Sequence, residues 1–312
     1  MFDVIVIGEG ISGLTVANNL ARRGVRVATM EGNMFGGLIL NVNELRPGPL
    51  GQDHACGADL CAGLMEANAA AGVESIQEAV KKVMVDAGAG FGVESGEGSR
   101  RATHVVVATG ARLRKLGVPG EIEFEGRGVS TCADCDGPMN VGTEVVVVGG
   151  GDSALQEALV LTEFASRVTL VHRRDSFRAR EELVDEVVNH SKISIVRNGR
   201  LVSISGKRAV ESARIESEGG RVETIACTGV FIYVGLAANA DFLPMDVARD
   251  PSGCVVTSSG GATSVERLWA VGAVRSGFRG LVPDAIADAN LVADHISAQL
   301  LSTQDQTRPM AT

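Results

Sequence analysis

Apolar positions along the chain fall into short runs, each followed by glycines and then by helical periodicity. Phe2–Ile7 is the first such run, and the glycine-rich turn Gly8–Gly13 follows it. Leu14–Arg23 then carries apolar residues at helical spacing, and Val25–Met30 is a second apolar run that ends at Glu31. The order of strand, glycine turn, helix and strand predicts a βαβ unit.

The same order recurs about 140 residues further along the chain. Glu144–Val148 is a strand pattern, Gly149–Ala154 is a second glycine turn, and Ser153–Phe164 has helical periodicity. Arg167–Val171 follows as another strand pattern. The chain is therefore predicted to hold two dinucleotide-type βαβ units.

Three further buried strands and one helix complete the predicted framework. The strands are Ala102–Ala108, Val230–Val234 and Leu268–Val271. Pro283–Leu301 is the predicted helix, with proline in its first turn. The polar segment Ser302–Thr312 is predicted to be a frayed tail.

Composition narrows the classes of function. A chain of 312 residues can hold two domains. Its net charge of −9 argues against a nucleic-acid partner, because nucleic acids bind to basic protein surfaces. No apolar run approaches the ~20 residues of a membrane span, and no basic segment precedes the first strand. We therefore expect no membrane association and a cytoplasmic location. Six cysteines in a chain of this length do not indicate a disulfide scaffold.

The first glycine turn suits a pyrophosphate. Gly8, Gly10 and Gly13 would let a phosphate approach the amide groups of a helix N-terminus, which side chains would block. Glu31 stands where a carboxylate accepts both ribose hydroxyls of an adenosine, which favours FAD or NAD over a 2′-phosphorylated nucleotide. The alternative is a tight turn without a ligand.

The second turn differs at the equivalent strand end. His172, Arg173 and Arg174 stand there, with Arg178 further on, and no acid is present. Guanidinium groups bind phosphate in a bidentate manner, so this unit should prefer a 2′-phosphate and hence NADPH. The alternative is a solvated basic loop.

Cys132 and Cys135 form a Cys-x-x-Cys pair. Near βαβ units such a pair indicates a redox disulfide. Half of a zinc site is the weaker alternative, because the chain has no second Cys-x-x-Cys. Two nucleotide units and one redox pair suggest a circuit in which NADPH reduces a flavin, the flavin reduces the disulfide, and the dithiol exchanges with an external disulfide.

These motifs together resemble the low-molecular-weight, bacterial-type thioredoxin reductases over nearly the whole chain. The strongest segments are Ala108–Arg112, Cys132–Pro138, Val145–Ala158 and His172–Ala179. The resemblance implies an α/β fold of two Rossmann-like domains and a homodimer. It implies an FAD domain built from residues 1–113 and 247–312, with an NADPH domain, 114–246, inserted between them and carrying the cysteine pair.

The resemblance also implies roles for individual residues. Cys135 would face the flavin, Cys132 would attack the partner disulfide, and Asp136 would exchange protons with the thiols. The implied FAD-binding residues are Gly8, Gly10, Ser12, Gly13, Glu31, Gly36, Gly37, Thr109, Gly110 and Gly272. The implied NADPH-binding residues are Gly149, Gly151, Asp152, Ser153, His172, Arg173, Arg174 and Arg178.

The sequence departs from the family pattern where the flavin would lie. Ala273 stands where the family has the Asp of a Gly-Asp motif, and Gly280 replaces the Gln of an Arg-Gln pair. Ile286-Ala287-Asp288 replaces a Gly-Asp-Gly motif, while Leu38 and Pro47 replace Gln and Asn. These changes predict weaker FAD binding or an altered flavin environment.

The leading interpretation is an NADPH-dependent flavoprotein that reduces thioredoxin, a thioredoxin-like protein or a small disulfide. A flavin-dependent dithiol oxidase on the same fold tends to lack the basic NADPH motif. A flavin-linked electron-transfer reductase usually lacks the cysteine pair. A non-catalytic NADP(H)-binding regulator with weakened FAD binding stays open, and the visible spectrum of the purified protein would distinguish it.

Overall fold

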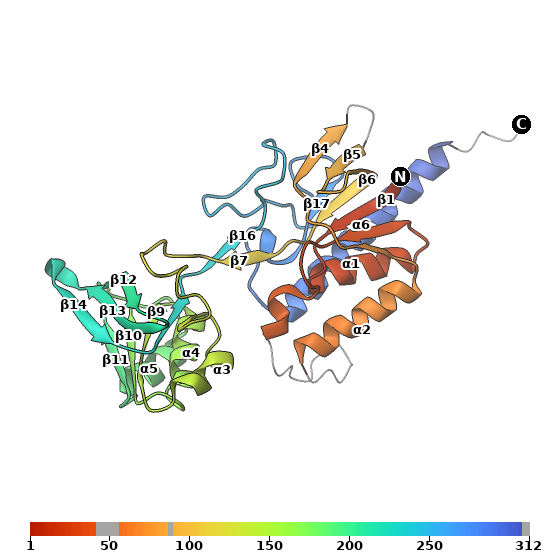
Figure 1. Cartoon of the computed structure of the whole chain (residues 1–312). Helices are drawn as coiled ribbons and strands as arrows, with labels where there is room; N and C mark the ends of the chain where they lie inside the picture. Colours follow the sequence, from red (N-terminus) through yellow and green to blue (C-terminus); the bar gives the residue numbers. More distant parts are fainter. Residues whose placement is uncertain (42–55, 87–89, 308–312) are drawn as a thin grey trace, which may run out of the picture. The chain divides into compact units, whose positions relative to one another are not determined.

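The computed structural model describes residues 1–41, 56–86 and 90–307, and the chain divides into two compact units (Figure 1). Unit 1 comprises Met1–Arg112 and Ala237–Thr312, and unit 2 comprises Leu113–Leu236. The chain passes from one unit to the other within two short strands, β7 (Ala111–Leu113) and β16 (Leu236–Ala238), which pair with each other.

A mostly parallel sheet forms the centre of unit 1. Its strands run in the order β3-β2-β1-β6-β5-β4, and β17 pairs with the carboxyl half of β6. β4 and β5 are antiparallel to their neighbours, whereas the others are parallel. The strands are β1 (Phe2–Ile7), β2 (Val27–Met30), β3 (Glu74–Ile76), β4 (Lys82–Asp86), β5 (Gly90–Glu94), β6 (Ser99–Val107) and β17 (Leu268–Ala270).

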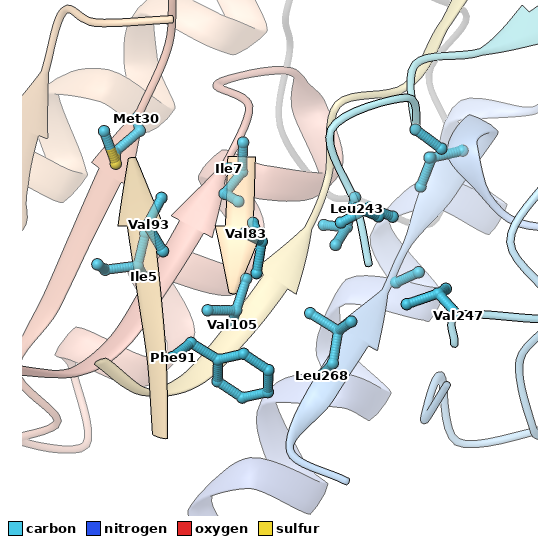
Figure 2. Close-up of a cluster of buried hydrophobic side chains, with 14 of the residues drawn as sticks. Ile5, Ile7, Met30, Val83, Phe91, Val93, Val105, Leu243, Val247 and Leu268 are labelled. Carbon is cyan, nitrogen blue, oxygen red and sulfur yellow. The ribbon is translucent and has the colours of Figure 1, made fainter. Parts of the chain in front are cut away.

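Period-two alternation in β1 divides the core of unit 1 into two faces. Val4 and Val6 pack with residues of α1 (Ile11–Ala21) and α6 (Val282–Thr307), while Ile5 and Ile7 pack on the opposite face. Figure 2 shows this second face, where side chains of β1, β5 and β17 meet Leu243 and Val247. Unit 1 also contains α2 (Gly57–Ala70) and the 3₁₀ turns η1 (Gly37–Asn41) and η4 (Gly272–Val274).

Unit 2 is built on a parallel sheet in the order β11-β10-β9-β15-β8. An antiparallel meander, β12-β13-β14, packs its apolar residues with one face of this sheet. The strands are β8 (Val129–Ser130), β9 (Glu144–Gly149), β10 (Arg167–Val171), β11 (Ile193–Val196), β12 (Arg200–Gly206), β13 (Val210–Glu216), β14 (Val222–Ala226) and β15 (Gly229–Tyr233). The helical segments are α3 (Ala133–Asp136), η2 (Gly137–Asn140), α4 (Asp152–Leu161), α5 (Glu181–Asn189) and η3 (Glu218–Gly220).

The structure confirms the predicted α/β class with parallel sheets, and several boundaries differ from the predicted ones; α1, for example, begins at Ile11 rather than Leu14. The last helix was expected to end at Leu301 but continues to Thr307, because no glycine or proline occurs before Pro309. The second domain boundary was expected between residues 246 and 247 but lies between 236 and 237. The reason is that Leu243 and Val247 are buried in the core of unit 1.

Candidate functional site: two glycine turns and a disulfide

The three glycines of the first turn lie in different surroundings, so glycine is needed at these positions for different reasons. A Cβ atom on Gly8, whose φ is +106°, would lie 2.5 Å from the Ala108 carbonyl oxygen, and one on Gly13 would lie 2.0 Å from the Gly8 oxygen. Within the described residues, a Cβ atom on Gly10 would meet only the Gly36 oxygen, at 3.7 Å. Gly8 and Gly13 are therefore required for packing, whereas Gly10 leaves open space beside the start of α1.

The start of α1 is open to an anion. Gly10 is the residue before the helix, and among the residues that the structure describes no side chain caps the first turn. Glu31, just after β2, accepts the Glu9 amide at Oε2 (3.1 Å) and the Asn33 amide at Oε1 (3.0 Å). Free helix amides with a fixed carboxylate beyond the next strand fit the pyrophosphate and ribose of a dinucleotide.

Several other predicted residues gather around this turn. The Gly36 amide donates to the Glu9 carbonyl (2.7 Å), which brings Gly36 and Gly37 to the turn, both at positive φ. Gly272, at φ +70°, lies against Ser12, because a Cβ atom there would be 2.4 Å from Ser12 Oγ. Thr109 donates its hydroxyl to the Asn239 carbonyl (2.6 Å), and a Cβ atom on its neighbour Gly110 would meet no atom within 4 Å.

Sequence reasoning missed Glu9, whose side chain is fully buried. Its carboxylate accepts the hydroxyls of Thr29 and Ser75, each at 2.6 Å, and the amide of Gln77 at 3.2 Å. These contacts fix the turn to β2 and β3. Glu9 lies between Gly8 and Gly10, where a polar residue is expected in solvent, so no sequence pattern indicates its burial.

The residues that depart from the family pattern differ in their surroundings. Ala273 is half-buried in η4, and Asp288 of α6 forms a bidentate ion pair with Arg275 (2.5 and 2.7 Å). Gly280 and Ala287 are exposed, as is Leu38 in η1, whereas Pro47 lies outside the described residues. Ala273 offers no hydrogen-bonding side chain, and the carboxylate of Asp288 is already held by a guanidinium.

The second glycine turn repeats this division of roles in unit 2. A Cβ atom on Gly149 would lie 2.5 Å from the Tyr233 oxygen, and one on Gly150 would lie 2.1 Å from the His172 ring. A Cβ atom on Gly151 would meet nothing within 4 Å. Gly151 precedes α4, and in the described part of the chain no side chain caps the start of that helix. The open space is again at the helix N-terminus, where a pyrophosphate fits.

The basic residues after β10 separate into one buried and three exposed side chains. His172 is buried against Gly150, with Nε2 3.0 Å from the Ser176 oxygen, and burial lowers the pKa of its imidazole. Arg173, Arg174 and Arg178 are exposed, and within the described ranges no carboxylate forms an ion pair with any of them. Three exposed guanidinium groups on one loop suit a phosphate.

Asp152 and Ser153 begin α4. Asp152 is engaged by Arg180, a residue that sequence reasoning missed. Its Oδ1 accepts the Arg180 amide (2.8 Å) and its Oδ2 accepts Nε (3.1 Å). Ser153 is exposed. The Arg178 amide donates to the Gly150 carbonyl (2.8 Å). These bonds hold the arginine loop against the glycine turn.

Cys132 and Cys135 form a disulfide at the start of α3, with their Cα atoms 5.4 Å apart. Cys132 is half-buried and its Sγ accepts the Cys135 amide (3.2 Å), while Cys135 is exposed. Asp136 is half-buried, directly after Cys135. No group of three or more potential ligands in the described part of the chain is arranged to hold a metal ion.

Two other cysteines have thiols suited to a hydrophobic core. Burial raises the pKa of Cys61 to about 11 and that of Cys227 to about 12. Both thiols therefore stay protonated at neutral pH and are poor nucleophiles.

Comparison with known proteins agrees with this geometry. The family model described as pyridine nucleotide-disulphide oxidoreductase matches residues 2–289. The chain therefore belongs to the pyridine nucleotide-disulphide oxidoreductase family, and it is an oxidoreductase. Its relatives within the family include the thioredoxin reductase of Treponema pallidum, which is 35% identical over 97% of this chain and 98% of the relative.

Solved structures support the same relationship. The thioredoxin reductase of Lactococcus lactis is 32% identical, with a TM-score of 0.86 over 97% of this chain and all of that one. The thioredoxin reductase of T. acidophilum is 29% identical, with a TM-score of 0.83 over 96% of this chain and 99% of that one. No helix in the described part of the chain combines the length and apolar character needed to cross a membrane.

Proposed function

We propose that this protein is an NADPH-dependent flavoprotein disulfide reductase acting on thioredoxin or a similar protein. The proposal has FAD in unit 1 and NADPH in unit 2. The main observation is that unit 2 contains three features together: the Cys132–Cys135 disulfide, a glycine turn and three exposed arginines. Support also comes from relatives named thioredoxin reductase, which are 35% identical over 95% of this chain or more.

In this proposal each glycine turn binds one of the two dinucleotides. The α1 amides beside Gly10 bind the FAD pyrophosphate and Glu31 accepts the ribose hydroxyls. The amides beside Gly151 bind the NADPH pyrophosphate, and the three arginines bind its 2′-phosphate. Held in this way, FAD would supply the chemistry that accepts a hydride from NADPH and donates two electrons to a disulfide.

The cysteine pair then acts by thiol–disulfide exchange. The Cys132 thiolate attacks the partner's disulfide, forming a mixed disulfide and releasing one partner thiolate. Cys135 next attacks Cys132 Sγ, which restores the Cys132–Cys135 disulfide and releases the second partner thiolate. Asp136 gives and takes the protons of these thiols.

The test is NADPH oxidation measured with a panel of thioredoxins, small disulfides and oxygen, with and without added FAD. We expect oxidation that depends on a thioredoxin and is lost in Cys132→Ser. Oxidation with oxygen alone would instead indicate an oxidase. A protein that binds NADPH but no flavin would indicate a regulator.

We also propose a homodimer and a cytoplasmic location. The dimer is suggested by resemblance to the family, and the location by the reducing conditions under which a dithiol donor works. Light scattering at micromolar concentration tests the first, with one chain mass as the contrary result. Cell fractionation tests the second, and recovery outside the cytosol would contradict it.

A further inference from the structure

We propose that Glu157 is a positioning residue that keeps the Cys132 thiol weakly acidic and thereby makes the Cys132–Cys135 dithiol more strongly reducing. Its carboxylate would do so by holding the first amide of α3. This inference deepens the proposed function and rests on it for its biological meaning. The evidence is a set of contacts inside unit 2.

Glu157 links three elements of unit 2. It lies in the second turn of α4, and its Oε2 accepts the Ala133 amide at 2.8 Å and the Tyr233 hydroxyl at 3.0 Å. Ala133 is fully buried and directly follows Cys132, while Tyr233 is the buried last residue of β15. The carboxylate is therefore fixed beside the redox pair by two donors.

Neither donor neutralises the charge of Glu157. A backbone amide and a phenol are both uncharged, and among the described residues no lysine or arginine forms an ion pair with this carboxylate. Burial, reinforced by the charge of Glu157, raises the pKa of Tyr233 well above its ordinary value. Tyr233 therefore remains a protonated donor throughout the physiological range.

Cys132 occupies the position that precedes α3, where helix amides normally stabilise a thiolate. The Cys135 amide does contact Cys132 Sγ, but the Ala133 amide is taken by Glu157. The negative carboxylate of Glu157 therefore lies near Cys132 Sγ and repels a thiolate there. The Ala133 amide, which could otherwise stabilise that thiolate, is engaged by Glu157. Since a thiolate is disfavoured there, the reduced pair is less stable and the disulfide potential is lower.

The other groups facing α3 do not offset this charge. On α3 itself the titratable residues are Asp134 and Asp136, both acidic. From β15 the facing group is the neutral Tyr233, and from α4 it is Glu157. Asp152, also on α4, is paired with Arg180. The 3₁₀ turn η2 supplies no titratable side chain, since its sequence is Gly-Pro-Met-Asn.

The decisive variant is Glu157→Gln in the full chain. The Gln oxygen still accepts from Ala133 and Tyr233, so the variant removes the charge and keeps the geometry. One measurement is the pH profile of Cys132 alkylation by iodoacetamide in the reduced protein, with the site followed by peptide mass spectrometry. The other is the equilibrium constant of the pair with dithiothreitol at about pH 9.5, where the Cys132 thiolate predominates and its stability therefore sets the equilibrium.

We expect Glu157→Gln to alkylate at Cys132 about three- to tenfold faster at pH 7, through a larger thiolate fraction. The equilibrium should shift toward the dithiol by about three- to tenfold, or about 15–30 mV for a two-electron couple. Tyr233→Phe keeps the charge and should not make the thiol more acidic. Glu163→Gln removes an exposed charge just after the same helix and is the matched control.

An unchanged alkylation profile and equilibrium in Glu157→Gln would overturn the inference, as would equal shifts in Glu163→Gln. None of these measurements requires NADPH, FAD or thioredoxin. A protein that reduces thioredoxin but shows no shift would contradict only this inference. A protein that shows the shift but does not oxidise NADPH would contradict only the proposed function.

Discussion

The side chains at the ends of β2 and β10 carry opposite charges, and this difference separates the two nucleotide turns. Glu31 is held by two backbone amides, so its carboxylate faces the turn in a fixed orientation. Arg173 and Arg174 are exposed and unpaired with acids among the described residues. A 2′-phosphate would be repelled at the first position and attracted at the second.

Changing Arg173 and Arg174 to Ala should therefore weaken the use of NADPH and leave that of NADH nearly unchanged. Each lost contact to a charged group costs about 1.5–3 kcal/mol, so kcat/KM for NADPH should fall at least tenfold. Steady-state kinetics with both nucleotides measures this. Arg221→Ala, at an exposed position elsewhere in unit 2, is the control. Equal losses for NADPH and NADH would refute the assignment.

Either Cys132→Ser or Cys135→Ser should abolish reduction of a protein disulfide while NADPH still reduces bound flavin. The reason is that exchange requires both sulfurs, whereas hydride transfer to flavin requires neither. Turnover with thioredoxin and anaerobic bleaching of the flavin spectrum measure the two steps separately. Full activity of Cys135→Ser toward a protein disulfide would rule out the circuit.

His104 should make unit 1 less stable in mild acid. Its buried Nδ1 accepts the indole N–H of Trp269 (3.3 Å), and burial, with the charge of Arg267, lowers the pKa of His104 to about 4 from 6.5. Between these values the unfolded chain binds the extra proton. The contribution of His104 to the free energy of unfolding is therefore fully present above about pH 6.5. It is lost as the pH falls toward 4, and the total loss is about 3 kcal/mol.

Urea unfolding followed by Trp269 fluorescence at pH 7.5 and pH 5 measures this loss, because Trp269 is the only tryptophan in the chain. His104→Asn keeps a hydrogen-bond acceptor but does not titrate, so its stability should change less between the two pH values. His190→Asn in unit 2 is the control. An unchanged pH dependence in His104→Asn would contradict the assignment.

At the scale of elements, the glycine turns distinguish packing from binding. Gly151→Ala should fold normally, since its Cβ atom meets no protein atom within 4 Å, but the methyl group would occupy the space beside the α4 amides. We expect NADPH affinity to fall at least tenfold with little change in melting temperature. Gly150→Ala, which collides with His172, should instead lower the melting temperature. Calorimetry and thermal unfolding give both quantities.

If Gly151→Ala bound NADPH as tightly as the parent, the pyrophosphate would have to lie elsewhere. Gly10→Ala offers the same comparison for FAD in unit 1, since its Cβ atom would be 3.7 Å from the nearest protein oxygen.

Elements with strong patterns were predictable from the sequence, and those specified by tertiary contacts were not. The apolar run Phe2–Ile7 and the glycines after it correctly indicated β1 and a following helix, although α1 begins at Ile11 and not at the expected Leu14. The meander β12-β13-β14 was missed because its polar, irregular strands carry no clear period. The contacts of Glu9 and Glu157 were also missed, because each joins residues distant in sequence.

Across the whole molecule, the departures from the family pattern are concentrated in unit 1. Most of them lie between Gly272 and Asp288, with Leu38 and Pro47 earlier in the chain, while the turn at Gly10 and the acid at Glu31 are intact. Unit 2 keeps both its open turn and its exposed arginines. The chain should therefore hold the adenosine half of FAD well and the flavin half less well.

FAD should consequently be partly lost on purification, and adding it should raise the melting temperature of unit 1. At one hundred times Kd the ligand contributes about 2.7 kcal/mol, or about 5–10 °C for a unit of this size. Ala273→Asp restores an acceptor beside Gly272 and should tighten FAD about two- to tenfold, since one hydrogen bond contributes about 0.5–1.5 kcal/mol. Flavin fluorescence titration measures the affinity, and Ala298→Asp, exposed on α6, is the control. Stoichiometric FAD that survives extensive dialysis of the parent protein would mean that other contacts replace the missing ones, and no tightening in Ala273→Asp would mean that position 273 does not reach the cofactor.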